Sequence, residues 1–165
     1  MLSPLTFFSL FILAIITNSV ASTGTVGQDP CKPRVTEKSK CYLDLYVNSQ
    51  CKAAVIRFAG TDLTKSCDSV NMFWNYPINN LTLIIDTPYT ANKQAYAIRL
   101  NTGGLSSTFF RIYQVQKNSI CKALKSRKGV ITAKCDQDYQ VGLKFQGPKY
   151  ISLFGVFIQY SVVRV

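Results

Sequence analysis

Apolar and polar residues alternate along much of this chain after residue 40, with a period of two rather than about 3.6. Residues 41–47, 52–58, 93–100 and 139–145 each place apolar side chains at every second position. Such alternation is typical of β-strands with one buried and one exposed face. The residues that we expect to share the inner faces are Leu43, Leu45, Val47, Ala54, Ile56, Phe58, Tyr96, Ile98, Leu100, Tyr139, Val141, Leu143 and Phe145.

Three further segments are apolar enough to form strands. Residues 81–86 are almost continuously apolar, and residues 108–117 are rich in aromatic side chains. Residues 151–165 combine β-branched and aromatic residues, which suits a buried strand. Only residues 121–128 favour a helical turn, and that segment is short for a stable helix. Asn, Gly and Pro residues separate these segments and predict turns between them.

About eight strands at this spacing predict an all-β fold. We expect a single disulfide-stapled antiparallel β-sandwich or jelly-roll-like domain over residues 31–165. Residues 22–30, STGTVGQDP, read as a flexible leader in front of it.

The first 21 residues carry no charge and hold a central apolar run that ends in Ser19-Val20-Ala21, a small-x-small cleavage pattern. The run is shorter than the ~20 residues that a membrane span needs, which favours a signal peptide over a signal anchor. We therefore expect residues 1–21 to be a signal peptide. The mature protein is expected to be secreted and extracellular, with no transmembrane segment.

Six cysteines all follow the expected cleavage site: Cys31, Cys41, Cys51, Cys67, Cys121 and Cys135. An even count in an oxidising compartment suggests three disulfides, and spacing alone leaves the pairing open. The local pair Cys121–Cys135 is our first expectation, with the other four joining the N-terminal segments. Asn80 begins an N-x-S/T sequon, which predicts an exposed glycosylation site.

The positive charge is concentrated in one part of the chain. Of 19 Lys and Arg residues, nine lie in residues 87–135, which contain no Asp or Glu, and the net charge is +11. Cations held together raise the local potential and attract acidic partners. The expected partner-binding residues are Lys117, Lys122, Lys125, Arg127 and Lys128. The alternative is a solvated hairpin whose lysines only keep the protein soluble.

The sequence contains no histidine. Catalysis by Ser-His-Asp or Cys-His systems and zinc sites built on histidine are therefore excluded. A histidine-independent hydrolase would need two cooperating carboxylates, drawn from Asp62, Asp68, Asp86, Asp136 and Asp138, and no spacing favours a pair. We expect a protein that is not an enzyme and holds no cofactor or metal.

Residues 73–77, Phe-Trp-Asn-Tyr-Pro, form an aromatic cluster beside a proline. Large aromatic residues dominate interior packing, so we expect Phe73 and Trp74 in the core and Tyr76 at the surface. The alternative is a ligand platform that includes Trp74 and Tyr76, which would make the protein a carbohydrate- or lipid-binding β-sandwich module.

A signal peptide followed by one small, basic, cysteine-containing β domain resembles, in format and over the whole chain, the small secreted effectors of plant-pathogenic fungi and other parasites. The resemblance implies a virulence protein that binds a host component, and leaves entry into a host cell open. The first expectation is thus a secreted interaction protein that binds an anionic protein, glycan or acidic lipid, extracellular or of a host. Nucleic acid is a less favoured partner, since no RNA-binding motif is present.

Overall fold

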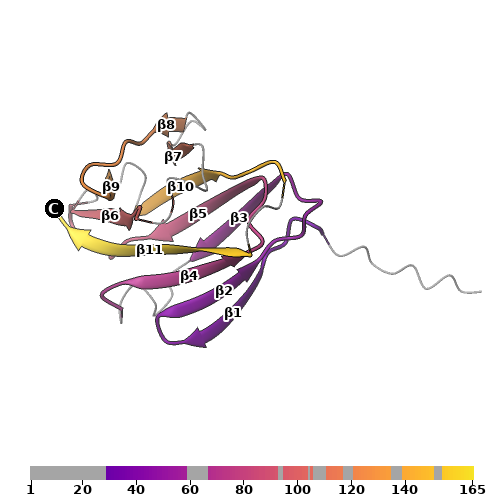
Figure 1. Cartoon of the computed structure of the whole chain (residues 1–165). Coiled ribbons are helices and arrows are strands. Elements are labelled where there is room, and N and C mark those ends of the chain that lie inside the picture. The colour runs from indigo at the N-terminus through magenta and orange to yellow at the C-terminus, as the bar shows by residue number, and fades with distance from the viewer. Residues whose placement is uncertain are drawn as a thin grey trace, which may run out of the picture.

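The computed structural model describes residues 29–58, 67–92, 95–103, 105, 111–116, 121–134, 139–150 and 154–165. The predicted signal peptide, residues 1–21, and all but the last two residues of the predicted leader lie outside these residues. The described part contains eleven strands and no helix (Figure 1). The strands are β1 (Arg34–Ser39), β2 (Tyr42–Tyr46), β3 (Ala53–Phe58), β4 (Val70–Asn75), β5 (Asn80–Asp86), β6 (Tyr96–Asn101), β7 (Arg111–Val115), β8 (Cys121–Ala123), β9 (Val130–Lys134), β10 (Gln140–Gln146) and β11 (Gly155–Arg164).

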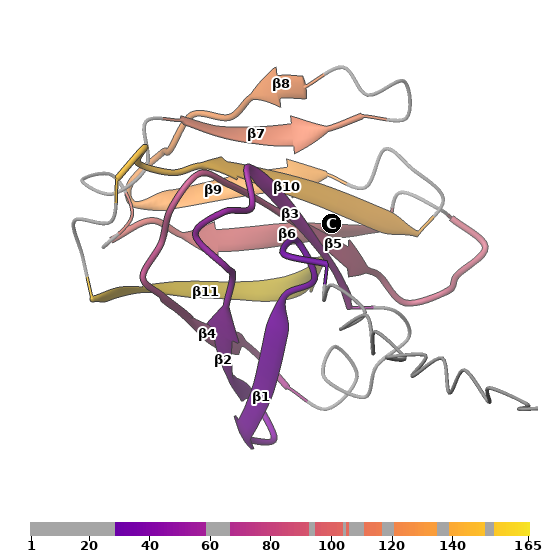
Figure 2. The ribbon, with the colours of Figure 1, turned by 90° about the vertical axis from the view of Figure 1, so that its right-hand side faces the viewer.

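These strands form two sheets. The six-stranded sheet has the order β1-β2-β4-β11-β6-β9, and the five-stranded sheet has the order β3-β5-β10-β7-β8. Figure 2 shows β8 at one side of the molecule and β1 at the opposite side. The prediction of an all-β fold is confirmed. The predicted number of about eight strands is wrong, because β1, β8 and β9 lack a long apolar alternation and the aromatic residues of β4 obscure its alternation.

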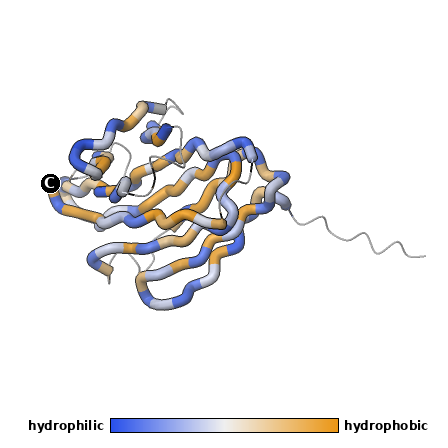
Figure 3. Tube along the Cα trace, in the orientation of Figure 1, coloured by the Kyte–Doolittle hydropathy of each residue, from blue (hydrophilic) through white to orange (hydrophobic). Residues whose placement is uncertain are grey.

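One hydrophobic core lies between the sheets. The largest fully buried side chains come from both of them, with Trp74 and Tyr160 from the six-stranded sheet and Leu83 and Phe145 from the five-stranded sheet. The rings of Phe58 and Tyr160 meet across the interface with centroids 6.5 Å apart. Figure 3 shows the alternation of hydrophobic and hydrophilic residues along the strands that this packing requires. Each fully buried large side chain contributes about 1.5–3 kcal/mol.

Most of the predicted inner residues are buried. Leu43, Leu45, Val47, Ala54, Ile56, Phe58, Ile98, Leu100, Val141, Leu143 and Phe145 all belong to the core. Tyr96 and Tyr139 are only half-buried, because Tyr96 is the first residue of β6 and Tyr139 precedes β10. Residues 155–164 form the strand expected there, and β11 lies between β4 and β6. It buries only one face, through Val156, Ile158 and Tyr160, so the expectation of a buried strand is wrong for its outer face.

The antiparallel prediction is wrong for two strand pairs. Strand β2 pairs with β4 in parallel, and β3 pairs with β5 in parallel. The chain passes from one sheet to the other at each step from β2 to β5, so strands two apart in sequence become neighbours running the same way. The expected helical turn over residues 121–128 is also wrong, since it begins with strand β8 paired to β7.

Two disulfides staple the N-terminal segments, as expected for the four cysteines that precede residue 70. Cys31 is bonded to Cys51, and Cys41 to Cys67, across sequence separations of 20 and 26 residues. These bonds are consistent with an extracellular protein. The expected third pair cannot be placed, because Cys135 and the side chain of Cys121 lie outside what the structure describes. None of the described segments is a helix with the length and apolarity that a membrane crossing needs.

Candidate functional site

The densest group of cations lies on the segment that joins the two sheets at their edges. We call residues 121–134 the basic crossover. It begins with β8, one of the two edge strands of the five-stranded sheet, and ends with β9, one of the two edge strands of the six-stranded sheet. Four of the five predicted partner-binding residues are described and exposed: Lys122, Lys125, Arg127 and Lys128. The fifth, Lys117, lies outside the described residues.

A two-residue turn forms the tip of the basic crossover. The N–H of Arg127 donates to the carbonyl of Val130 over 2.8 Å, and the N–H of Val130 donates back over 3.1 Å. The two central residues have positive φ, 51° at Lys128 and 78° at Gly129, as in a type I′ turn. Glycine adopts this conformation readily, but lysine does so at a cost. The turn therefore fixes the orientation of the Cα–Cβ bond of Lys128.

Hydrogen bonds anchor the crossover to both sheets. Thr102, which follows β6, donates its N–H to the carbonyl of Gly129 over 2.8 Å, and its hydroxyl lies 2.9 Å from that of Ser126. Gln114 of β7 is buried and donates its side-chain amide to the carbonyl of Lys134 over 2.6 Å. The segment that carries the cations is thus hydrogen-bonded to the end of β6 in one sheet and to β7 in the other.

An open groove of about 530 Å³ lies beside the tip, on the outer face of the six-stranded sheet. The pairing of β6 with β9 and β11 brings its walls together from three distant segments. The groove is lined by Asp68, Ser69, Arg99, Asn101, Lys128, Gly129, Val130, Gln159, Tyr160 and Ser161. It therefore offers two cations, hydroxyl groups and side-chain amides against one carboxylate.

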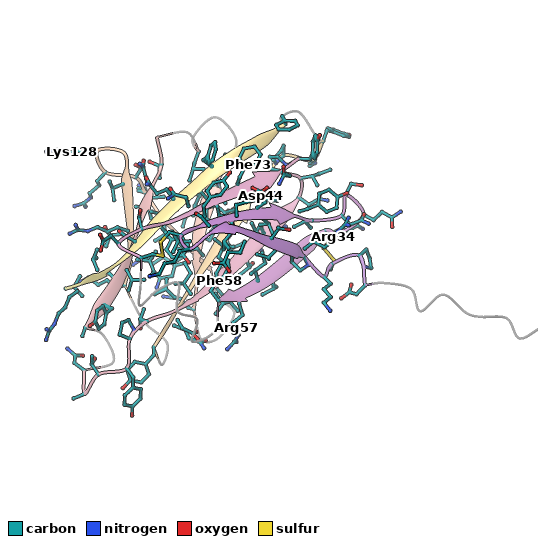
Figure 4. The ribbon with its side chains drawn as sticks, turned by 90° about the horizontal axis from the view of Figure 1, so that it is seen from below. Arg34, Asp44, Arg57, Phe58, Phe73 and Lys128 are labelled. Atoms are coloured by element: carbon teal, nitrogen blue, oxygen red, sulfur yellow. A yellow bond between two sulfur atoms is a disulfide. The ribbon has the colours of Figure 1, made fainter. Side chains whose placement is uncertain are left out.

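The cations of this region are not neutralised within the part of the chain that the structure describes. None of Lys122, Lys125, Arg127 and Lys128 forms an ion pair with another described residue; elsewhere, Lys38 and Asp44 are paired at 3.5 Å. Figure 4 shows Lys128 at the end of the molecule opposite Arg34. Figure 3 shows hydrophilic residues in the loop between β8 and β9. No described acid therefore neutralises the charge of the basic crossover.

The predicted ligand platform of Trp74 and Tyr76 does not exist as such. Trp74 is fully buried, since β4 points Val70, Met72 and Trp74 into the core. The expectation that Phe73 is a core residue is wrong, because it lies on the outer face between Asn71 and Asn75. The alternation of Val70, Met72 and Trp74 with two asparagines is the signal that would have assigned these faces. Tyr76 is exposed, as expected.

The remaining predicted sites are placed as follows. Asn80 begins β5 and is only half-buried, with β3 and β10 paired on its two sides. Of the five candidate carboxylates, Asp68 and Asp86 are described, and Asp62, Asp136 and Asp138 lie outside the described residues. Within the described residues there is no group of three or more Cys, Asp and Glu side chains that could hold a metal ion.

No protein-family model matches this sequence, and no curated protein is detectably similar to it.

Proposed function

We propose that this protein is a secreted interaction protein that binds a polyanionic partner through the basic crossover and the adjoining groove. The observation that carries the proposal is the turn at Lys128 and Gly129, which holds a lysine in a left-handed conformation at the mouth of a groove that also contains Arg99. Unfavourable backbone conformations persist where the surrounding structure enforces them, and they cluster at binding sites.

The charge distribution supports the same function. Residues 87–135 contain nine cations and no acid, and several exposed ones lie on the basic crossover, whose backbone is hydrogen-bonded to Thr102 and Gln114. A rigid cluster attracts an anion more strongly than the same charges on a free loop, because less conformational entropy is lost on binding. The attraction is reduced by salt, since the Debye length is about 8 Å at physiological ionic strength.

The partner is proposed to carry repeated negative charges, as sulfated glycans, acidic lipid surfaces and acidic proteins do. If the protein acts on a host, as its format suggests, the polyanion belongs to that host. Heparin, phosphatidylserine vesicles and polyglutamate represent these three classes and can be compared at low and physiological salt.

The test replaces Lys122, Lys125, Arg127 and Lys128 together by alanine. The matched control replaces four exposed lysines elsewhere, Lys32, Lys40, Lys52 and Lys149, and so removes the same net charge. We expect the first variant to lose binding to one of the three polyanions at physiological salt by at least tenfold, and the control to retain it. Equal losses in the two variants would show that net charge alone is responsible and would refute the proposed site.

A further inference from the structure

Five aromatic side chains form a continuous row on the outer face of the six-stranded sheet, away from the basic crossover. We call Tyr42, Phe73, Tyr76, Phe154 and Phe157 the aromatic row. Neighbouring ring centroids are separated by 6.3 Å for Tyr42–Phe157, 4.8 Å for Phe157–Phe73, 6.1 Å for Phe73–Phe154 and 5.2 Å for Phe154–Tyr76. From the level of Tyr42 and Asn71 to Tyr76 the row extends about 17 Å along the strands, at ~3.3 Å per residue.

The row is exposed to solvent, and its side chains are not part of the hydrophobic core. Phe154 is 69% exposed, Phe157 60% and Tyr76 41%, while the same strands bury Trp74, Val156 and Ile158 on the opposite face. Single exposed apolar residues are ordinary, but contiguous large ones mark binding surfaces. Five adjoining rings on a paired, regular sheet therefore indicate a binding surface.

Two local backbone features keep the rings in place. Gly155 lies opposite Asn75 between Phe154 and Phe157, and a Cβ atom at this position would collide with the ring of Phe73. The missing side chain thus lets the ring of Phe73 cover the backbone of β11. Tyr76 has a φ of 47°, and its N–H donates to the carbonyl of Phe154 over 2.9 Å. This strained residue holds the ring of Tyr76 against the edge of Phe154.

Uncharged hydrogen-bonding groups border the rings. The strand register aligns Tyr42, Asn71, Gln159 and Asn101 in one line across β2, β4, β11 and β6. Asn101 donates to the side-chain carbonyl of Gln159 over 3.0 Å, while the amide of Asn71 has no hydrogen-bond partner among the described residues. The neighbouring carboxylate of Asp44, which faces Phe73 in the register, is paired with Lys38. Figure 4 shows Phe73 and Asp44 together, far from Lys128.

We propose that the aromatic row binds a neutral polysaccharide. Pyranose rings present apolar C–H faces that stack on aromatic side chains, and their hydroxyl groups exchange hydrogen bonds with amides such as that of Asn71. The surface favours this ligand over a polyanion or an acidic membrane, because its border is amide and the carboxylate of Asp44, which faces Phe73, is already paired with Lys38. The rings of the row lie outside the proposed polyanion site, although Asn101 and Gln159 of its border also line the groove. The proposal does not depend on polyanion binding.

The experiment measures binding of the disulfide-bonded protein, produced from the full sequence, to insoluble chitin, cellulose and β-1,3-glucan. The test variant is Phe154→Ala with Phe157→Ala, both strongly exposed and away from the core. Its control is Tyr89→Ala with Tyr150→Ala, which removes two rings that are 85% and 81% exposed outside the row. We expect wild type and control to bind one of these polymers and the test variant to bind at least tenfold more weakly. Phe157→Tyr, which keeps the ring, should retain binding.

Other occupants of the row give different results. Absence of binding to all three polymers, or equal binding by the test and control variants, would overturn the proposal. So would a wild-type dimer in sedimentation that the test variant converts to a monomer, because the row would then bind a second copy of the chain. Binding to phosphatidylcholine vesicles that the test variant loses, with no polymer bound, would assign the row to a membrane surface instead.

Discussion

The aromatic row and the basic crossover share one sandwich but are built in different ways. The crossover takes its cations from consecutive residues on one segment, anchored at Thr102 and Gln114. The row takes its rings from β2, from β4 and the residue after it, and from β11 and the residue before it, and exists only through their register. A surface made of neighbours in sequence can be seen in the sequence, whereas a surface made of neighbours in space depends on the pairing of strands.

Destabilising the core that both surfaces share should impair the two surfaces alike. Trp74→Ala is expected to destabilise the protein by about 3–5 kcal/mol, because it deletes a fully buried ring. Phe73→Ala, one residue away on the outer face, should cost only about 1 kcal/mol. Urea denaturation of both variants measures the contrast. Similar losses for the two would mean that the assignment of the two faces of β4 is wrong.

The disulfides should affect the two regions unequally. Cys41 precedes Tyr42, and its carbonyl accepts a hydrogen bond from the N–H of Asn71 at 2.9 Å, so the Cys41–Cys67 bond fixes one end of the aromatic row. Replacing both cysteines by serine should lower the free energy of unfolding by about 3 kcal/mol. At a temperature where the variant is still folded, polysaccharide binding should weaken more than polyanion binding. If polyanion binding weakened more than polysaccharide binding, the disulfide would not be what fixes the end of the aromatic row.

Two glycines offer a matched pair of smaller changes, one in each region. Gly155→Ala places a methyl group against the ring of Phe73 and should weaken polysaccharide binding severalfold, while polyanion binding is unchanged. Gly129→Ala meets no neighbouring atom but forces alanine to a φ of 78°, at a cost of about 1–2 kcal/mol. That variant should weaken polyanion binding only. Titration of both variants with both ligands gives the comparison, and an effect of either glycine on the other ligand would contradict it.

The smallest effect concerns pH and should not distinguish the two regions at all. Burial raises the pKa of Tyr160 well above its ordinary value, and its hydroxyl has no hydrogen-bond partner among the described residues. The neutral form is therefore favoured by folding, so this stability is present below pH ~10 and is lost as the pH rises through the folded-state pKa. Thermal midpoints between pH 8 and 11 should fall less steeply in Tyr160→Phe than in wild type. Parallel curves would show that Tyr160 does not contribute.

The sequence was sufficient where a strand buries one face. The inner residues of 41–47, 52–58 and 139–145 follow from alternation, because every second side chain enters the same core. Strand β1 escaped prediction because all six of its residues are exposed, and its position is set by pairing with β2 rather than by burial. Parallel pairing of β2 with β4 is equally invisible, since alternation is the same in either direction.

The candidate sites divide in the same way. The exposure of Lys122 to Lys128 could be expected because unpaired charges need water. The groove beside them could not, since Arg99, Lys128 and Gln159 meet only after β6 has paired with both β9 and β11. For the same reason, residues 73–77 alone predict the exposed Tyr76 but not the ring of Phe154 that packs against it.

The central claim is that one sandwich carries two binding surfaces that can be disrupted separately, and a reciprocal binding measurement tests it most directly. The Lys122/Lys125/Arg127/Lys128 alanine variant and the Phe154/Phe157 alanine variant are each titrated with the polyanion and the neutral polysaccharide that wild type binds. We predict that each variant loses at least tenfold in affinity for one ligand and less than twofold for the other. Loss of both ligands in either variant, with the fold intact, would contradict the claim.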